Sequence, residues 1–81
     1  MNNPSKVDCI TILSAARELG EDALLQLDPS SLGLTRNRMQ AAAAFLIERG
    51  CFKHHRHGDG HCAVGGLSLQ GKLRLDQFIS G

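Results

Sequence analysis

Residues 32–66 read LGLTRNRMQAAAAFLIERGCFKHHRHGDGHCAVGG, and this stretch decides the fold. It opens with a Leu-Gly-Leu turn followed by Thr35, whose side chain is suited to cap the N-terminus of a helix. Apolar side chains then recur at helical spacing up to Gly50, a residue that commonly ends helices. The pattern predicts a helix over 36–49 with an outer face of small residues and amides.

The second half of this stretch has the pattern of a β-hairpin. A basic, histidine-rich segment leads into a His-Gly-Asp-Gly turn, and a short return strand follows. A two-residue loop of Gly58 and Asp59 would pair Arg56 with His61. Strand alternation would then divide the side chains between two faces, with His55, His57 and Cys62 on one and His54, Arg56 and His61 on the other.

A capped helix that runs directly into a basic hairpin resembles the winged helix-turn-helix superfamily. The Leu-Gly-Leu-Thr string is similar to the junction between the second and third helices of such proteins, and Gln70-Gly71-Lys72 is similar to the joint after the wing. The resemblance implies an α+β fold with three helices, a two-stranded β-hairpin wing and a short C-terminal helix. We expect a single winged-helix domain over residues 1–81.

The N-terminal segment reads as a helix that covers the core. Residues 5–19 place apolar side chains at three- and four-residue steps, which is typical of an amphipathic helix. Ser5 followed by Asp8 resembles a capping box at its start. Gly20 is suited to the left-handed conformation that ends a helix. We expect no chemistry from this helix.

The two remaining segments are shorter and leave alternatives open. The pattern of residues 21–27 predicts a short second helix. Its leucines would lie on the buried side, and its first turn would contain acidic residues. Asp28-Pro29 either begins another helical turn or simply breaks the chain. The apolar residues near the C-terminus form a short closing helix or a pairing surface for another copy of the chain: Leu73, Leu75, Phe78 and Ile79.

Composition limits the class of protein. The chain has 81 residues and three phenylalanines, so its core is small and filled mainly by aliphatic side chains. Its apolar runs are shorter than the roughly 20 residues of a membrane span, and its first residues lack the layout of a signal peptide. Three cysteines fit reduced thiols better than a disulfide framework. We therefore expect a cytoplasmic protein.

Charge is unevenly distributed along the chain. The net charge is +1, but residues 1–35 carry five acidic and two basic side chains, whereas residues 36–74 carry seven basic and two acidic ones. A basic half of this kind can bind a polyanion by releasing its counterions. A solvated surface without a partner explains the same charges equally well.

The resemblance implies a transcriptional regulator that binds double-stranded DNA. The recognition helix, residues 35–49, would enter the major groove, and the wing, residues 51–66, would touch the flanking backbone. We expect a homodimer, because a two-fold pair can read two half-sites. The candidate DNA-binding residues are Ser31, Thr35, Arg36, Asn37, Arg38, Gln40, Lys53, His54, Arg56 and His61.

Three alternatives were weighed against DNA binding. A protein–protein interaction module is favoured by the alanine-rich outer face of the third helix and by the near-neutral total charge. A metal-sensing regulator would use imidazole and thiolate ligands on the wing, drawn from His55, His57, Cys62 and Cys51. The chain has no phosphate-binding glycine loop and no group that orients a Cys–His pair, so we expect neither an enzyme nor a cofactor.

Overall fold

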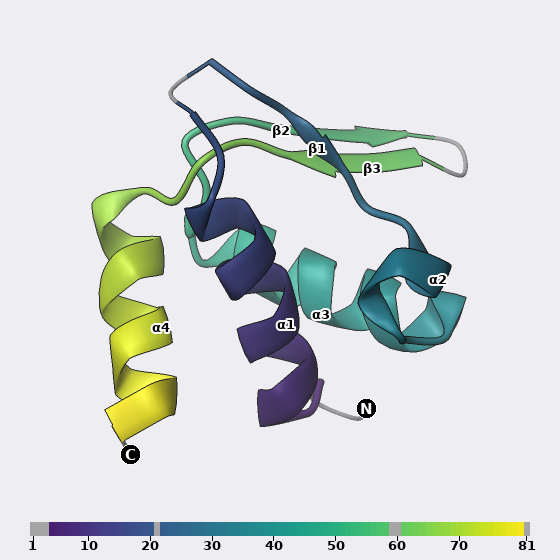
Figure 1. The fold of residues 1–81 in the computed structure, drawn as a ribbon, viewed down its shortest axis with the longest axis horizontal. Coiled ribbons are helices and arrows are strands. Elements are labelled where there is room, and N and C mark those ends of the chain that lie inside the picture. Colours follow the sequence, from purple (N-terminus) through teal and green to yellow (C-terminus); the bar gives the residue numbers. More distant parts are fainter. Residues whose placement is uncertain (1–3, 21, 59–60, 81) are drawn as a thin grey trace.

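The chain has an α+β fold in which helices pack beneath a small antiparallel sheet (Figure 1). The computed structural model describes residues 4–20, 22–58 and 61–80, and of residues 57, 58 and 61 it describes the backbone alone. These ranges contain four helices, α1 (Lys6–Arg17), α2 (Pro29–Leu32), α3 (Arg36–Glu48) and α4 (Leu69–Ser80), and three strands, β1 (Leu25–Gln26), β2 (His55–Gly58) and β3 (His61–Val64). The expected α+β class is confirmed, whereas the expected two-stranded hairpin is part of a three-stranded sheet.

Side-chain caps fix where the first three helices begin. The hydroxyl of Ser5 accepts a 3.1 Å hydrogen bond from the third amide of α1, and the carboxylate of Asp28 accepts one of 3.0 Å from the third amide of α2. The hydroxyl of Thr35 accepts a 3.2 Å bond from the third amide of α3. Each cap satisfies an amide that has no partner within its helix. The start of α3 and the helical alternative for Asp28-Pro29 are therefore confirmed.

Two glycines in the left-handed conformation end α2 and α3. Gly33 has φ 70° and Gly50 has φ 66°, a region that other residues enter only with strain. The expectation that Gly20 ends α1 in the same way is wrong, because Gly20 is not among the residues with positive φ. The last residue of α1 is Arg17, and Glu18 caps it in a right-handed conformation.

The expected helix over residues 21–27 is also wrong. Residue 21 lies outside the described residues, and Leu25–Gln26 form β1, which pairs with β3. Leu25 is half-buried, Gln26 is exposed and Leu27 is buried, so burial alternates with the two-residue period of a strand. Pairing of Leu25 and Gln26 with β3, and a 2.8 Å hydrogen bond from the amide of Leu27 to the carbonyl of Cys62, give this backbone its partners in the sheet.

The sheet has the strand order β1-β3-β2, with both pairings antiparallel. His57 pairs with Cys62 and Gly58 with His61, so the expected loop of Gly58 and Asp59 is wrong. Asp59 lies outside the described residues. The observed register differs from the expected one by two residues, which keeps every position on its expected face. The backbone pairing continues before the start of β2 and after the end of β3, as far as the bridge between Phe52 and Leu67.

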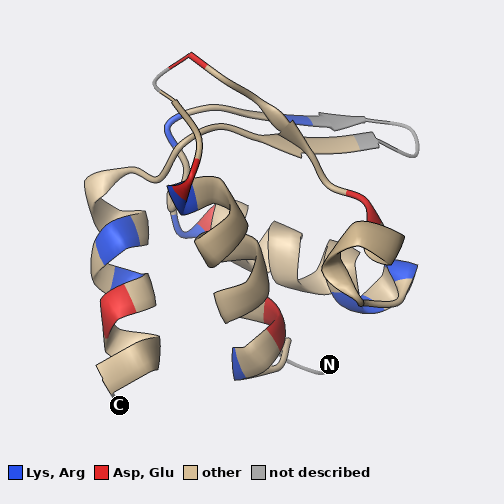
Figure 2. Ribbon diagram, in the orientation of Figure 1, with Lys and Arg blue, Asp and Glu red and all other residues tan. Residues whose placement is uncertain are grey.

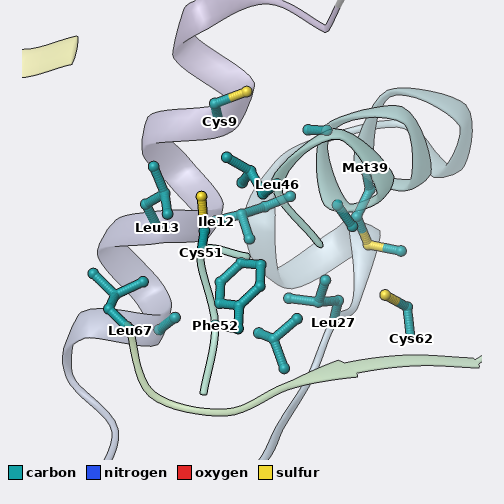
Figure 3. Close-up of a cluster of buried hydrophobic side chains, with 14 of the residues drawn as sticks. Cys9, Ile12, Leu13, Leu27, Met39, Leu46, Cys51, Phe52, Cys62 and Leu67 are labelled. Carbon is teal, nitrogen blue, oxygen red and sulfur yellow. The ribbon is translucent and has the colours of Figure 1, made fainter. Parts of the chain in front are cut away.

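The core lies between the sheet and the helices. Figure 3 shows Ile12 and Leu13 of α1, Leu46 of α3 and the Phe52 ring converging on the side of β3 that faces the helices. α1 packs against both α3 and α4, and this places it at the centre of the helical layer. The buried face of α3 consists of Met39, Ala42, Ala43 and Leu46. None of the helices in the described ranges has the length and hydropathy that a membrane crossing requires.

A close contact joins the end of α3 to the start of α4. The Ser68 hydroxyl donates a 2.6 Å hydrogen bond to the carbonyl of Gly50 and accepts one of 3.1 Å from the amide of Gly71. The amide of Ser68 donates to the carbonyl of Cys51 at 3.0 Å. Gly71 then lies directly against that carbonyl, so closely that an added Cβ would overlap the Cys51 oxygen. Position 71 therefore requires glycine for space.

We expect Gly71→Ala to destabilise the protein by about 1–3 kcal/mol, the usual cost of overpacking a close contact. An exposed glycine whose backbone conformation alanine can adopt behaves in the opposite way, since alanine there stabilises by about 0.4–1 kcal/mol. The matched control is Gly20→Ala, because a Cβ at Gly20 meets nothing within 4 Å. Chemical denaturation of the two variants measures the difference. Equal stability of Gly71→Ala and the parent chain would show that the close contact between Gly71 and the carbonyl of Cys51 is not required.

Candidate nucleic-acid interface

The outer face of α3 presents amides, one arginine and small side chains to solvent. Arg36, Asn37 and Gln40 lie in the first two turns, and all three are exposed. Ala41 and Ala44 continue the same face and are also exposed. Met39 and its buried neighbours hold the opposite face in the core, so the orientation of α3 is fixed. The first acidic residue of this helix is Glu48, at its far end.

The hairpin extends toward the same end of the molecule as the start of α3. Figure 1 places β2, β3 and the α2–α3 junction at one end of the longest axis, with α4 at the other end. β2 is an edge strand, and His54, His55 and Arg56 are exposed along it. The structure thus brings Arg36, Asn37 and Gln40 to the same end as the basic strand. His61 lies in β3 opposite Gly58, and its side chain is outside the described part of the molecule.

Arg38 forms an ion pair that the sequence analysis did not anticipate. Its Nε donates to Asp8 Oδ2 at 3.0 Å and its Nη2 donates to Oδ1 at 2.6 Å, a bidentate arrangement between α3 and α1. The carboxylate side chain of Asp8 is 3% exposed, whereas the arginine side chain is 53% exposed. Hydrogen bonding to Arg38 is the main reason that the pKa of Asp8 is lowered, and it raises the pKa of Arg38. Asp8 is therefore the partner of Arg38 as well as the residue whose amide is capped by Ser5.

A signal for this pair was present in the sequence. Asp8 precedes the buried Ile12 by four residues, so it lies on the same stripe of α1 as the core residues. A carboxylate on a buried stripe needs a cationic or hydrogen-bonding partner. Among the described residues Asp8 is the one buried charged side chain, and Arg38 supplies that partner.

Two other predicted contacts are already engaged within the chain. The Ser31 hydroxyl donates to Asp28 Oδ2 at 2.9 Å, which places a carboxylate beside it. The hydroxyl of Thr35 accepts a hydrogen bond from the amide of Arg38, and the same hydroxyl can still donate a hydrogen bond to another group. A negative charge next to Ser31 opposes a phosphate there, so Thr35 is the better-placed donor of the two.

The basic residues are divided among several parts of the surface. Figure 2 shows one group where α3 begins and others on α4 and around the base of the hairpin. Lys53 lines a hollow of about 230 Å³ with Arg17 and Lys72, on the α4 side of the molecule. Arg49 stacks over the Phe45 ring, 3.6 Å from its centroid. The basic half of the sequence therefore does not form one continuous positive surface.

The three thiols are buried, and they are all free. Figure 3 shows the Cys62 side chain close to Leu27 and Met39, on the core side of the sheet. Burial raises the pKa of Cys9 to about 11, and it also raises the pKa values of Cys51 and Cys62. The proposed metal ligand Cys62 thus belongs to the core, and the side chain of His57 lies outside the described residues. Among the side chains that are described, no group of His, Cys, Asp or Glu residues could hold a metal ion.

Comparison of the chain with protein-family models, with curated proteins and with solved structures finds no match.

Acid will remove the contribution of the Asp8–Arg38 pair to stability. The pKa of Asp8 is lowered by folding from its ordinary value of 3.8, so the unfolded chain binds the proton more tightly than the folded one. The contribution is complete above pH 3.8 and is lost as the pH falls through the lower folded pKa. Thermal unfolding measured from roughly pH 7 to pH 2.5 should show a steeper loss for the parent chain than for Asp8→Asn.

A matched pair of arginine variants provides the control at neutral pH. Arg38→Ala leaves a buried carboxylate without its cation, whereas Arg36→Ala removes an exposed side chain from the same turn. We expect a clearly larger fall in the unfolding midpoint for Arg38→Ala. Equal midpoints for the two variants would contradict a structural role for the pair.

The thiols should react slowly with a thiol reagent in the folded protein. Nucleophilic attack requires thiolate, and burial disfavours thiolate at all three cysteines. A chromogenic disulfide reagent at neutral pH should report little reaction until denaturant is added, when all three react. Rapid reaction of one cysteine in the folded chain would show that its side chain is accessible.

Proposed function

We propose that the chain is a winged-helix protein that binds double-stranded DNA and acts as a transcriptional regulator. The order of its elements supports this reading, because α2 and α3 are joined by a three-residue turn containing Gly33, as in helix-turn-helix motifs. α3 is followed directly by the antiparallel pair β2–β3, in the position of a wing. The four-helix, three-stranded arrangement is compatible with a winged-helix-like fold.

The outer face at the start of α3 is the observation that carries the proposal. In the major groove, arginine can bond to guanine in bidentate fashion, and asparagine or glutamine to adenine. Arg36, Asn37 and Gln40 have these chemistries, are exposed and lie at the end of the helix that reaches base edges. Ala41 and Ala44 behind them leave room for the groove wall. Arg56 and His54 on the hairpin would contact the flanking backbone.

Arg38 has a different part in this proposal from the one first expected. Two of its donors are held by Asp8, so its main role is to position the first turn of α3 on α1. Its side chain is half-exposed, and the remaining guanidinium donors can still face a phosphate. We therefore assign base reading to Arg36, Asn37 and Gln40, and positioning to Arg38.

One observation favours a second candidate, a protein–protein interaction module. Arg38 and Arg49 have intramolecular partners and Lys53 lies on the α4 side, so few cations surround the start of α3. A helix face of alanines permits close approach by another protein as well as by a groove wall. Salt separates the two candidates, because affinity for DNA falls steeply with salt and an apolar contact does not.

Binding to duplex DNA should depend on the amides of α3. A pool of random duplexes supplies the preferred sequence by repeated selection, and fluorescence anisotropy then measures affinity as salt is raised. Gln40→Ala should weaken binding to the selected sequence about 5- to 150-fold, the cost of one bidentate base contact. The logarithm of the affinity should fall by about 0.9 per phosphate contact for each tenfold increase in salt.

The matched control is Gln77→Ala, which removes an exposed amide from α4 at the other end of the molecule. It should leave DNA affinity unchanged. If no duplex is retained at micromolar protein and low salt, DNA binding is wrong and the interaction module takes its place. Equal losses for Gln40→Ala and Gln77→Ala would contradict the assignment of α3 as the reading helix.

A further inference from the structure

α4 carries exposed apolar side chains in addition to its buried stripe. Gly71 and Leu75 are buried on the side that packs against the rest of the chain. Three further apolar side chains of α4 are exposed, Leu69 at 73%, Leu73 at 51% and Ile79 at 61%. A surface helix normally has one apolar stripe and one polar face. The second apolar group therefore needs an explanation outside the packing of one chain.

The outer residues follow the spacing of a helix-pairing stripe. Leu69, Lys72, Asp76 and Ile79 are separated by three, four and three residues, so they lie along one face of α4. The stripe has apolar ends and a charged centre of both signs. Arg38–Asp8 is the ion pair of the described ranges, so Lys72 and Asp76 have no ionic partner among the described residues.

This stripe is complementary to itself when it is reversed. In an antiparallel pair of α4 helices centred on residue 74, Leu69 lies opposite the partner's Ile79, because the two positions are equally distant from the centre. Lys72 lies opposite the partner's Asp76 for the same reason. A two-fold axis repeats both contacts, so each charge meets its opposite and each apolar end meets another.

A hollow beside the stripe can receive side chains from a second helix. It has a volume of about 440 Å³ and lies between the end of α1 and the outer side of α4. Leu73, Lys72, Asp76 and Ile79 form its α4 wall, with Arg17 and Leu67 opposite. Knobs on one helix insert into such spaces on its neighbour. The groove and the exposed leucines therefore lie together on one face of the molecule.

We propose that α4 is the interface of a homodimer, in which two copies pair antiparallel through Leu69, Lys72, Asp76 and Ile79. A single 12-residue helix and its groove make a small interface, so we expect a dissociation constant of roughly 1–100 µM. α4 lies at the opposite end of the longest axis from the start of α3, so pairing leaves that face of each copy open (Figure 1). The dimer is measured without DNA, and its failure is therefore distinct from failure of the proposed function.

Charge reversal at the centre of the stripe tests the proposal. Sedimentation equilibrium of the full chain up to about 200 µM measures the dimer. Lys72→Asp and Asp76→Lys should each weaken it by at least about tenfold, because like charges then face each other twice. The double variant exchanges the two charges and should return to within about threefold of the parent chain. Lys6→Asp and Asp22→Lys change net charge equally at exposed sites outside α4 and should have no effect.

The outcomes separate cleanly. Failure of the double variant to recover, or a monomer at every concentration, would overturn the proposal. A dimer that tolerates both single reversals would also overturn it, because the contact would then lie on another face. Circular dichroism reports whether each variant is folded. If a reversal at residue 72 or 76 unfolds the chain, Leu69→Asp replaces it, because Leu69 is 73% exposed and its loss leaves the core intact.

Discussion

The carboxylate of Asp8 and the guanidinium of Arg38 hold α1 and α3 in one relative position. A buried ionised carboxylate is tolerated only when a cation and hydrogen bonds replace the water it has lost. The bidentate contact with Arg38, at 2.6 and 3.0 Å, provides both in a fixed geometry. Because Arg38 lies next to Met39, this contact also fixes the rotation of α3 at its first turn. Met39 then faces the core, and Asn37 and Gln40 face solvent.

The other end of α3 is held by a second set of contacts of a different kind. Backbone and hydroxyl hydrogen bonds through Ser68 join Gly50 and Cys51 to the start of α4, and Gly71 permits the close approach. The bridge between Phe52 and Leu67 lies at the same junction. One polar pair and one steric contact therefore anchor α3 at its two ends. The helix between them presents an outer face of one arginine, two amides and exposed alanines.

The sequence predicted those features of the fold that are encoded locally. Thr35, Gly50 and the apolar spacing between them fixed α3, because caps and periodicity act within a few residues. β1 was missed because it is two residues long and depends on Val64, about forty positions away, for its pairing. The hairpin register failed for a different reason, because the expected and the observed registers place the same side chains on the same faces and alternation cannot separate them.

The candidate site was predictable in its residues but not in its electrostatics. Arg36, Asn37 and Gln40 were identified as exposed residues at the start of α3, and they are exposed. Summing charge along the chain gave a basic half, whereas folding ties Arg38 to Asp8, some thirty positions earlier, and moves Lys72 to the far end. A count of charges along the sequence cannot show how the basic residues are distributed over the surface, because that depends on which charges meet in space.

The distribution of the basic residues over separate parts of the surface links the proposed DNA binding to the proposed dimer. Affinity for a polyanion rises with the number of free cations that meet it, and one copy of this chain brings few of them to the start of α3. Joining two copies makes the second binding event intramolecular, so a pair of weak surfaces acts at a high effective concentration. A pairing face on α4 would supply that gain without covering α3. The pairing of Arg38 with Asp8 is thus a reason why the proposed DNA binding would gain from the proposed dimer.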